Sequence, residues 1–360
     1  CFVKRIILVG GGTAGHVEPA LAVGRYLTKK DSDIVLEFIG TKSGVEVELL
    51  ADTGIIFHPI LKVPFPRKMN FQTIVWPVKF KVAFWQSFKA IRKSDAVVGF
   101  GGYVSAPVYL AAKLQRIPLI IHEANAKPGM ANNLGTHLTK NQFLAFPDAK
   151  HEDKRWRGAQ VIGMPIKENI ANFSKINSTE VRQNYLMNLG LDPSKKTLLV
   201  FGGSIGATKI NDAISGAIPE ILNNGWNVIH AVGNQNHLPN STSGYCAMPY
   251  IKEMDQAYAA ADFIISRSGA VTCAELLAVG KPALLIPLAI GNGEQEANAK
   301  VLVESGQAKL VSNNEFNVNW LNTNLVELLN KKWVSHNLAP NNAAAQLGEA
   351  IFKILESKPL

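Results

Sequence analysis

The sequence predicts an α/β protein built from two doubly wound parallel-sheet domains. Three observations predict it: a length of 360 residues, a hydrophobic content of 47%, and a strand–glycine turn–helix pattern that occurs in each half. A chain of this length exceeds what one hydrophobic core usually serves, and two domains of roughly 150 to 200 residues are the natural expectation. The hydrophobic content is sufficient for two packed cores and excludes a disordered chain.

Short β-branched runs alternate with helical patterns, which is typical of parallel sheets flanked by helices. The predicted strands are Ile6–Val9, Ile34–Ile39, Ala96–Phe100 and Leu119–His122 in the first half, and Leu198–Phe201, Val228–Val232, Phe263–Ser266 and Ala283–Pro287 in the second. The two halves look duplicated, because Ile7–Thr13 and Leu199–Ser204 both read as a strand followed by a glycine turn.

The domain boundary is predicted after Val161–Pro165, where an apolar strand gives way to a polar segment rich in Asn, Ser and Lys. We therefore assign residues 1–163 to an N-terminal domain and 164–342 to a C-terminal one, with a cleft between them. Ligands of such sheets bind outside the carboxyl ends of the strands, so each domain would hold one of two ligands. From its residues alone, the last helical stretch, Ala343–Leu355, could belong to either half.

Charge and cysteine content narrow the class of protein. Lys and Arg outnumber Asp and Glu by 37 to 28, and this excess favours nucleotides, phosphates, nucleic acid or acidic lipid without choosing among them. The cysteines, Cys1, Cys246 and Cys273, are too few and too scattered for a disulfide framework or a zinc cluster, which fits a reducing cytosol. No apolar run approaches the roughly 20 residues of a membrane-spanning helix, so we expect membrane contact to be peripheral.

The first glycine turn, Gly10–Gly15, satisfies the dinucleotide pattern G-x-G-x-x-G, in which glycines permit a tight turn and close approach of a phosphate. NAD binding also requires an acid at the end of the second strand. Glu37 lies inside the Ile34–Ile39 run instead, which counts against NAD. An ordinary strand-to-helix connector is the alternative, although connectors seldom need three consecutive glycines.

Two further glycine turns, Gly99–Ser105 and Gly202–Ala207, also follow predicted strands. Each would expose backbone N–H groups at a helix start, and such groups attract anions without the use of side chains. Three phosphate-competent turns exceed the needs of one cofactor. A chain that holds one pyrophosphate on each of two ligands would use them.

The segment Ser266–Glu275 reads as a strand end, a loop of small residues and a helix start with an acid. The N-terminus of a helix can bind a diphosphate, and the Glu275 carboxylate can accept hydrogen bonds from both hydroxyls of a ribose. A capping box formed by Thr272 and Glu275, which needs no ligand, fits the pattern equally well.

Together these motifs resemble the MurG family, the family 28 glycosyltransferases that add N-acetylglucosamine to a polyprenyl-linked muramyl peptide in peptidoglycan synthesis. The resemblance spans nearly the whole chain and rests on the order and spacing of motifs at Gly11–Val17, Gly101–Pro107, His122–Asn125, Phe201–Ser204, Arg267–Ala270 with Glu275, and Gln295 with Asn298 and Ala299. It implies the GT-B architecture: two Rossmann-like domains separated by a cleft, with the final helix crossing back onto the first domain.

The resemblance also implies a UDP-N-acetylglucosamine site, formed mainly by the C-terminal domain. Glu275 would hold the ribose and the backbone of Ile251 the uracil. The diphosphate would contact Ser204 and Thr272, and the sugar would be lined by Asn125, Ala270, Val271 and Gln295. The remaining predicted donor residues are Thr13, Gly15, Lys167 and Arg267. The phosphates of the acceptor are assigned to Gly12, Thr13, Gly102 and Tyr103.

Three positions depart from the family pattern. Ile205 stands where Gln is common, Met164 where Asn precedes the interdomain proline, and Lys167 where Arg follows it. A lysine keeps the positive charge of an arginine but lacks its two-pronged hydrogen-bonding geometry.

An α-linked donor and the β-1,4-linked product of the family imply inversion by direct displacement, which requires one base. His16 is the first choice, because it begins a helix beside a phosphate-binding turn, where the positive helix end favours the neutral imidazole. Its alternative role is that of an ordinary polar residue in a first helical turn. Glu123, just past a strand, is the alternative base or a structural partner of a buried loop. No histidine pair has metal-ligand spacing, so neither a metal nor another cofactor is predicted.

Cations and aromatic residues are interleaved between Lys62 and Lys93, a mixture that suits an anionic bilayer surface. Within this stretch, one helical stripe is assigned to the core: Val78, Val82 and Trp85. A second stripe would face the membrane together with Lys81: Trp76, Phe80 and Phe84. The alternative is a helix buried on two sides.

The expected partners are UDP-N-acetylglucosamine, the polyprenyl-linked muramyl peptide, an anionic membrane surface and other proteins of cell-wall synthesis, but not nucleic acid. The expected location is the cytoplasmic face of the inner cell membrane. Other functions remain open: a GT-B transferase with another lipid acceptor such as diacylglycerol, an NAD-linked oxidoreductase or epimerase, and a non-catalytic sensor of UDP-N-acetylglucosamine.

Overall fold

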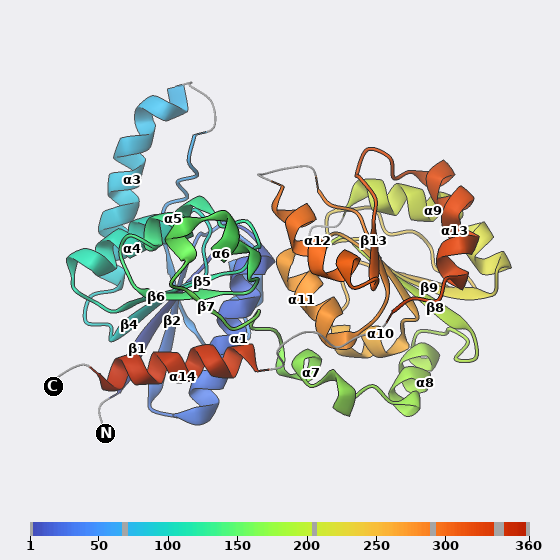
Figure 1. Cartoon of the computed structure of the whole chain (residues 1–360), viewed down its shortest axis with the longest axis horizontal. Coiled ribbons are helices and arrows are strands. Elements are labelled where there is room, and N and C mark those ends of the chain that lie inside the picture. Colours follow the sequence, from blue (N-terminus) through green and yellow to red (C-terminus); the bar gives the residue numbers. More distant parts are fainter. Residues whose placement is uncertain (1–2, 67–70, 204–206, 289–292, 335–341, 358–360) are drawn as a thin grey trace. The chain divides into compact units, whose positions relative to one another are not determined.

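The computed structural model describes residues 3–66, 71–203, 207–288, 293–334 and 342–357. The chain forms two compact units (Figure 1). Unit 1 comprises Cys1–Lys167 and Asn342–Leu360, and unit 2 comprises Glu168–Asn341. The boundary between the units thus falls after Lys167, whereas the sequence analysis placed the domain boundary after Gly163.

Within the described residues, unit 1 contains a seven-stranded parallel sheet of order β3-β2-β1-β4-β5-β6-β7. Its strands are β1 (Lys4–Val9), β2 (Ile34–Gly40), β3 (Ile56–Pro59), β4 (Ala96–Gly99), β5 (Leu119–Glu123), β6 (Asn141–Leu144) and β7 (Gln160–Val161). The strand order reverses between β1 and β4. This is the topological switch point, where doubly wound sheets bind their ligands.

Helices cover both faces of this sheet. They are α1 (Ala14–Lys30), α2 (Glu46–Leu50), α3 (Phe71–Ala90), α4 (Ser105–Leu114), α5 (Met130–Gly135), α6 (Asp148–Glu152) and α14 (Ala343–Glu356), with a short 3-10 helix at Lys154–Trp156. Side chains alternate along β1, so that Ile6 and Leu8 join a core with α1 and α14. Ile7 and Val9 join a second core with α4.

Helix α14 lies in unit 1, where it packs along α1 (Figure 1). The Tyr26 hydroxyl donates a hydrogen bond to Glu349 Oε1 at 2.6 Å. A Cβ at Gly348 would lie 2.3 Å from the Tyr26 ring, so a glycine there allows the helices to approach closely. Leu347 and Ile351 are completely buried in the core of this unit.

Within the described residues, unit 2 contains a six-stranded parallel sheet of order β10-β9-β8-β11-β12-β13. Its strands are β8 (Lys196–Phe201), β9 (Trp226–Ala231), β10 (Tyr245–Met248), β11 (Phe263–Ser266), β12 (Ala283–Leu285) and β13 (Ala308–Leu310). The switch point lies between β8 and β11. The predicted fold class, two Rossmann-like parallel-sheet domains, is therefore confirmed.

The helices of unit 2 are α7 (Glu168–Ala171), α8 (Thr179–Asn188), α9 (Thr208–Asn223), α10 (Met254–Ala260), α11 (Ala270–Val279), α12 (Glu294–Glu304) and α13 (Val318–Asn330), with a 3-10 helix at Phe173–Lys175. Residues Ile210, Ile214, Leu321 and Leu325 of α9 and α13 are completely buried against one face of the sheet. Helix α9 is the next element of the chain after β8.

Helix α3 contradicts the predicted assignment of its two apolar stripes. Val78, Val82 and Trp85, assigned to the core, are 67%, 44% and 49% exposed. The stripe assigned to the membrane is half-buried instead: Trp76, Phe80 and Phe84.

The small residues of α3 decide which face is buried. Ala83 and Ser87 are completely buried, and they let the helix backbone approach the rest of unit 1. Phe84 lies on the same side and packs against the core, whereas Trp76 stacks on Phe80 with ring centres 5.0 Å apart. In the described part of the chain, no helix has the length and apolar content that crossing a bilayer requires.

Candidate functional site

Two glycine turns touch each other at the switch point of unit 1. Gly102 has φ +83°, and a Cβ at this residue would lie 2.2 Å from the carbonyl oxygen of Gly11. Gly12 has φ +90°, and a Cβ there would lie 2.9 Å from the Tyr103 ring. Only glycine therefore permits the turn after β1 and the turn after β4 to approach this closely.

The predicted acceptor-phosphate residues Gly12, Thr13, Gly102 and Tyr103 belong to these two turns. Thr13 is the N-cap of α1, and its side chain makes no capping hydrogen bond. Gly15 lies in the first turn of the same helix. The Lys62 ammonium lies 5.7 Å from the centre of the Tyr103 ring. A helix N-terminus, a glycine turn and a cation next to one another are a suitable arrangement for an anion.

His16, in the first turn of α1, has its ring oriented by two contacts. Its Nδ1 lies 3.1 Å from the carbonyl oxygen of Gly11 and 3.2 Å from Thr13 Oγ1. Because a carbonyl oxygen can only accept, we assign the proton of the neutral ring to Nδ1. Nε2 is then the proton acceptor. A Cβ at Gly101 would lie 3.5 Å from this Nε2, so the glycine keeps space beside it.

Glu123, the alternative base, is only 1% exposed at the end of β5. Its Oε1 accepts hydrogen bonds from Asn125 N at 2.9 Å and Asn125 Nδ2 at 3.2 Å. Its Oε2 accepts from Gly129 N and Asn132 Nδ2, both at 3.0 Å. Proton abstraction by this carboxylate would disrupt the loop that it holds, so the geometry fits the structural role.

Asn132, which the sequence analysis did not single out, connects this loop to α4. Its Nδ2 also donates to the carbonyl oxygen of His122 at 3.1 Å, and its Oδ1 accepts from the Tyr109 hydroxyl at 2.7 Å. Burial raises the pKa of Tyr109, which keeps the hydroxyl a donor. An asparagine in a short polar helix carries no sequence signal of burial, and only the packing places it beside Glu123.

The segment that leaves unit 1 is anchored by two contacts. His122 Nε2 lies 2.9 Å from the carbonyl oxygen of Gly163. Burial lowers the pKa of His122 to about 4, so the ring is neutral and donates from Nε2. Lys167 Nζ, predicted at the donor site, forms an ion pair with Glu18 Oε1 of α1 at 3.4 Å.

Glu37 has a structural role that leaves none for a dinucleotide ribose. It lies inside β2, is 5% exposed, and receives a 2.6 Å hydrogen bond from Arg5 Nη2. His58 Nε2 contacts the same carboxylate oxygen, Oε2, that accepts from Arg5 Nη2. The hydrogen bond from Arg5, followed by that from His58, lowers the pKa of Glu37. The observation supports the argument against NAD.

In unit 2, helix α11 begins at Ala270 and its N-cap is Gly269, which has no capping side chain. The capping box proposed as an alternative is therefore wrong, because it requires Thr272 at the N-cap. Ala270, Val271 and Thr272 form the first turn, so their backbone N–H groups are the unpaired donors at a helix N-terminus. The completely buried Ser268 Oγ, just before them, has no hydrogen-bond partner among the described residues.

Glu275 lies one turn further along α11. Its Oε2 accepts a hydrogen bond of 2.9 Å from the hydroxyl of Tyr258 on α10. Ile251, the predicted uracil contact, is buried in the connection between β10 and α10. The predicted contacts of the uridine therefore lie on α11 and on the segment that leads into α10.

The remaining donor residues of unit 2 border these elements. Arg267 Nη1 donates to the carbonyl oxygen of Ile286 at 3.0 Å and to Asn313 Oδ1 at 2.7 Å, and burial lowers the pKa of this guanidinium. Gln295 Oε1 accepts from Leu288 N at 2.9 Å. In the third glycine turn, Gly203 has φ +93°. Ser204 and Ile205 lie outside the described residues.

The described ranges contain two of the three cysteines of the chain. Cys246 and Cys273 are free thiols, and burial raises the pKa of both. In the same ranges, no three or more His, Cys, Asp or Glu side chains are grouped so that they could hold a metal ion.

Comparison with known proteins shows the same two-domain organisation. Residues 6–143 match the glycosyltransferase family 28 N-terminal domain, and residues 197–353 match the glycosyltransferase family 28 C-terminal domain. The UDP-N-acetylglucosamine--N-acetylmuramyl-(pentapeptide) pyrophosphoryl-undecaprenol N-acetylglucosamine transferase of Thermobifida fusca is 41% identical over 351 residues, which cover 96% of this chain and 90% of the relative.

Solved structures agree. The crystal structure of MurG from Acinetobacter baumannii has a TM-score of 0.71 and 28% identity, and the match covers 97% of this chain and 99% of that one. The UDP-GlcNAc 2-epimerase of Neisseria meningitidis, with a TM-score of 0.64 and 17% identity over 97% of this chain and 100% of its own, shows the fold alone. The two domain matches and the relative that is similar over nearly its full length confirm the resemblance, and the chain belongs to glycosyltransferase family 28.

Proposed function

We propose that this chain is an inverting hexosyltransferase that moves N-acetylglucosamine from UDP-N-acetylglucosamine to the 4-hydroxyl of undecaprenyl-pyrophosphoryl-N-acetylmuramyl-pentapeptide. The observation that carries the proposal is the similarity, over 96% of the chain, to the Thermobifida fusca transferase with that name. The glycine turns and helix N-termini of both units support it, because the two substrates each contain a pyrophosphate.

Unit 2 holds the donor in this proposal. The first turn of α11, Ala270–Thr272, and the third glycine turn with Ser204 bind the diphosphate through N–H groups. Glu275 accepts both ribose hydroxyls, and the backbone of Ile251 contacts the uracil. Gln295, Val271 and Arg267 border the sugar. The uncapped start of α11 favours this assignment, because a helix N-terminus without a capping side chain stabilises a negative charge.

Unit 1 supplies the base. We propose that His16 Nε2 takes the proton of the 4-hydroxyl as that oxygen attacks the anomeric carbon. The new carbon–oxygen bond forms as the bond to the β-phosphate breaks on the opposite face, so the configuration inverts. UDP leaves with the bonding electron pair, and the N–H groups of unit 2 stabilise its charge. The hydrogen bond from Nδ1 to Gly11 supports this role, because it leaves Nε2 as the acceptor.

The acceptor pyrophosphate lies, in this proposal, against the paired turns of unit 1, at Gly12, Thr13, Gly102 and Tyr103. Gly15 and Asn125 are proposed to contact the transferred sugar. Lys167 acts as an anchor of the chain between the units rather than as a donor contact, because it already forms an ion pair with Glu18.

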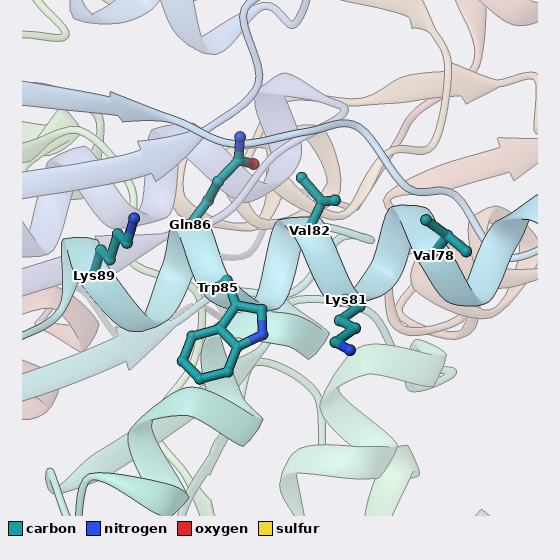
Figure 2. Close-up of a pocket in the computed structure, with 6 residues that line it drawn as sticks. All are labelled: Val78, Lys81, Val82, Trp85, Gln86 and Lys89. Carbon is teal, nitrogen blue, oxygen red and sulfur yellow. The ribbon is translucent and has the colours of Figure 1, made fainter.

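One face of α3 is proposed to rest on the anionic surface of the cytoplasmic leaflet. Figure 2 shows six side chains of α3 that line a shallow hollow of about 380 Å³: Val78, Lys81, Val82, Trp85, Gln86 and Lys89. Ile74, one turn before Val78, is 74% exposed. Figure 1 shows the N-terminal half of α3 extending away from the sheet of unit 1.

Exposed apolar side chains next to lysines favour a bilayer, where the chains enter the interface and the ammonium groups meet anionic headgroups. The acceptor gives a reason for such contact. Removing a polyprenyl chain from the bilayer would cost about 0.8 kcal/mol for each methylene, so an enzyme that reaches its substrate at the surface avoids that cost.

Transfer of radiolabelled N-acetylglucosamine tests the function. We expect the label to appear on a polyprenyl-linked muramyl acceptor and not on diacylglycerol, and we expect UDP but not NAD to bind in calorimetry. Label on diacylglycerol would assign another acceptor, binding without transfer would make the protein a sensor, and binding of NAD would overturn the proposal.

A further inference from the structure

Tyr258 is a completely buried residue that contacts the predicted ribose site. It lies on α10, and its hydroxyl donates a 2.9 Å hydrogen bond to Glu275 Oε2. Its ring meets the Phe201 ring edge-on, with centres 6.3 Å apart. Phe201 is the last residue of β8 and directly precedes the third glycine turn. One side chain thus links the ribose carboxylate with the base of the diphosphate turn.

We propose that Tyr258 is a positioning residue of the donor site, which orients the Glu275 carboxylate so that it accepts the two ribose hydroxyls of UDP-N-acetylglucosamine. The inference rests on the proposed function and adds a residue to it. Tyr258 does not touch the substrate in this proposal. It acts through Glu275.

The physical reason is the freedom of a glutamate side chain. A partly exposed glutamate on a helix surface samples several rotamers, and only some of them present the carboxylate to a ribose. A hydrogen bond from a rigid, buried donor selects one orientation in advance. Preorganisation of this kind strengthens binding because less conformational entropy is lost when the ligand arrives.

Burial makes Tyr258 a constant donor. Desolvation, and then the negative charge of Glu275, raise the pKa of Tyr258 well above that of a free tyrosine. The hydroxyl therefore keeps its proton at every pH at which the protein would work. Its packing on Phe201 fixes the ring, so the hydroxyl can serve as a fixed point for the carboxylate.

Helix α10 also connects Tyr258 with the predicted contact of the uracil. Ile251, the predicted uracil contact, lies three residues before α10 (Met254–Ala260), and Tyr258 lies within that helix. The segment that would contact the uracil and the residue that orients the ribose carboxylate therefore belong to one continuous stretch of chain. A shift of α10 would displace both contacts together.

The variant Tyr258→Phe tests the proposal, because it removes the hydroxyl and keeps the ring. Calorimetry would measure the Kd of UDP and of 2′-deoxy-UDP. We expect the Kd of UDP to rise about fivefold to tenfold. The Kd of 2′-deoxy-UDP should change less, so the preference for the ribose over the deoxyribose should fall. If Tyr258 had a merely structural role, the variant would weaken the binding of both ligands equally and leave that preference unchanged.

Tyr245→Phe is the matched control. Tyr245 is also a buried tyrosine of unit 2, and its hydroxyl bonds to His230 Nδ1 at 3.1 Å rather than to Glu275. This variant should keep the wild-type preference. A double-mutant cycle with Glu275→Ala adds a second measurement, because the effect of Tyr258→Phe should disappear once the carboxylate is gone. If Tyr258→Phe does not fold, Phe201→Leu, which loosens the packing of the Tyr258 ring and leaves the Glu275 side chain unchanged, should lower the same preference.

The outcomes separate this inference from the function on which it rests. Loss of the ribose preference in Glu275→Ala, with the wild-type preference retained in Tyr258→Phe or in the Phe201→Leu substitute, would overturn the role of Tyr258 and leave the function standing. A wild-type protein that binds no UDP would overturn the proposed function itself.

Discussion

The two units have the same strand order around their switch points and carry different chemistry there. In unit 1, two glycine turns touch and His16 stands beside them. In unit 2, the switch point lies between β8 and β11, helix α11 begins at Ala270 without a capping side chain, and Glu275 lies one turn along that helix. The common fold supplies N–H groups in both places. Under the proposed function, His16 in unit 1 activates a hydroxyl and Glu275 in unit 2 holds a nucleotide.

The strongest test of this comparison is His16→Ala. If unit 1 supplies the base, kcat should fall about a hundredfold to ten-thousandfold, which is the usual contribution of a general base. The Kd of UDP should stay within about twofold, because unit 2 holds the donor. Steady-state transfer and calorimetry would measure the two effects. Undiminished turnover would remove His16 as the base.

Acid should destabilise both units through one buried histidine in each. The pKa of His122 in unit 1 and that of His230 in unit 2 are lowered by burial to about 4, compared with 6.5 in the unfolded chain. The unfolded chain therefore binds these protons from pH 6.5 downward, whereas the folded units do so only near pH 4. The free energy of unfolding is highest above pH 6.5. As the pH falls from 6.5 to about 4, it decreases by about 3 kcal/mol for each histidine.

Hydrogen exchange followed by mass spectrometry would resolve this loss separately in β5 and β9. The variant His122→Gln should flatten the acid dependence in unit 1 and leave that of unit 2 unchanged. After correction for the intrinsic pH dependence of exchange, an opening free energy that stays constant between pH 7 and 4.5 in the wild-type protein would contradict the expectation.

Glu275→Ala should show the opposite kinetic pattern to His16→Ala. Loss of the carboxylate should weaken UDP binding about tenfold to fiftyfold, because charge-assisted hydrogen bonds to two hydroxyls are removed. The kcat at saturating donor should change much less. Calorimetry and steady-state kinetics with varied UDP-N-acetylglucosamine would measure this, and a fall in kcat at unchanged affinity would break the division of labour between the units.

The smallest expected effect concerns binding to the membrane. We propose that unit 1 alone makes this contact. Val82→Glu on α3 should reduce binding to phosphatidylglycerol vesicles roughly fivefold, because a negative charge enters the interface. Val326→Glu on α13 of unit 2 is the matched control, since the two valines are 44% and 47% exposed. Co-sedimentation with vesicles would measure both. Equal losses in the two variants would exclude α3 as the contact face.

Pattern alone predicts the central strands and not several of the others. Ile6–Val9 and Leu198–Phe201 are recognisable because strands buried on both faces are continuous apolar runs. β3, β6, β10 and β13 have only three or four residues each, and β3, β10 and β13 lie at sheet edges, where a strand has a neighbour on one side only. Their assignment depends on pairing with a neighbour, which no local pattern records.

The stripes of α3 show a second limit. The sequence analysis assigned Trp76, Phe80 and Phe84 to the outside, because one apolar stripe was taken to be enough for the core. The buried face is defined by Ala83 and Ser87, whose small side chains allow close packing. Hydrophobic periodicity gives the direction of a stripe and not the neighbour against which it packs.

The amino-acid sequence by itself determined the two doubly wound domains and the family, and it singled out His16 and Glu275 as candidate site residues, because strand patterns and glycine turns are local signals. The tertiary structure decided which hydrogen-bond partners the candidate site residues have. Glu123 accepts hydrogen bonds from the loop that follows it, including one from Gly129 N. The carbonyl oxygen of Gly11 lies beside His16, and the hydroxyl of Tyr258 contacts Glu275. Contacts of this kind join segments far apart in the chain or depend on the path of a turn, so they exist only once the backbone is folded.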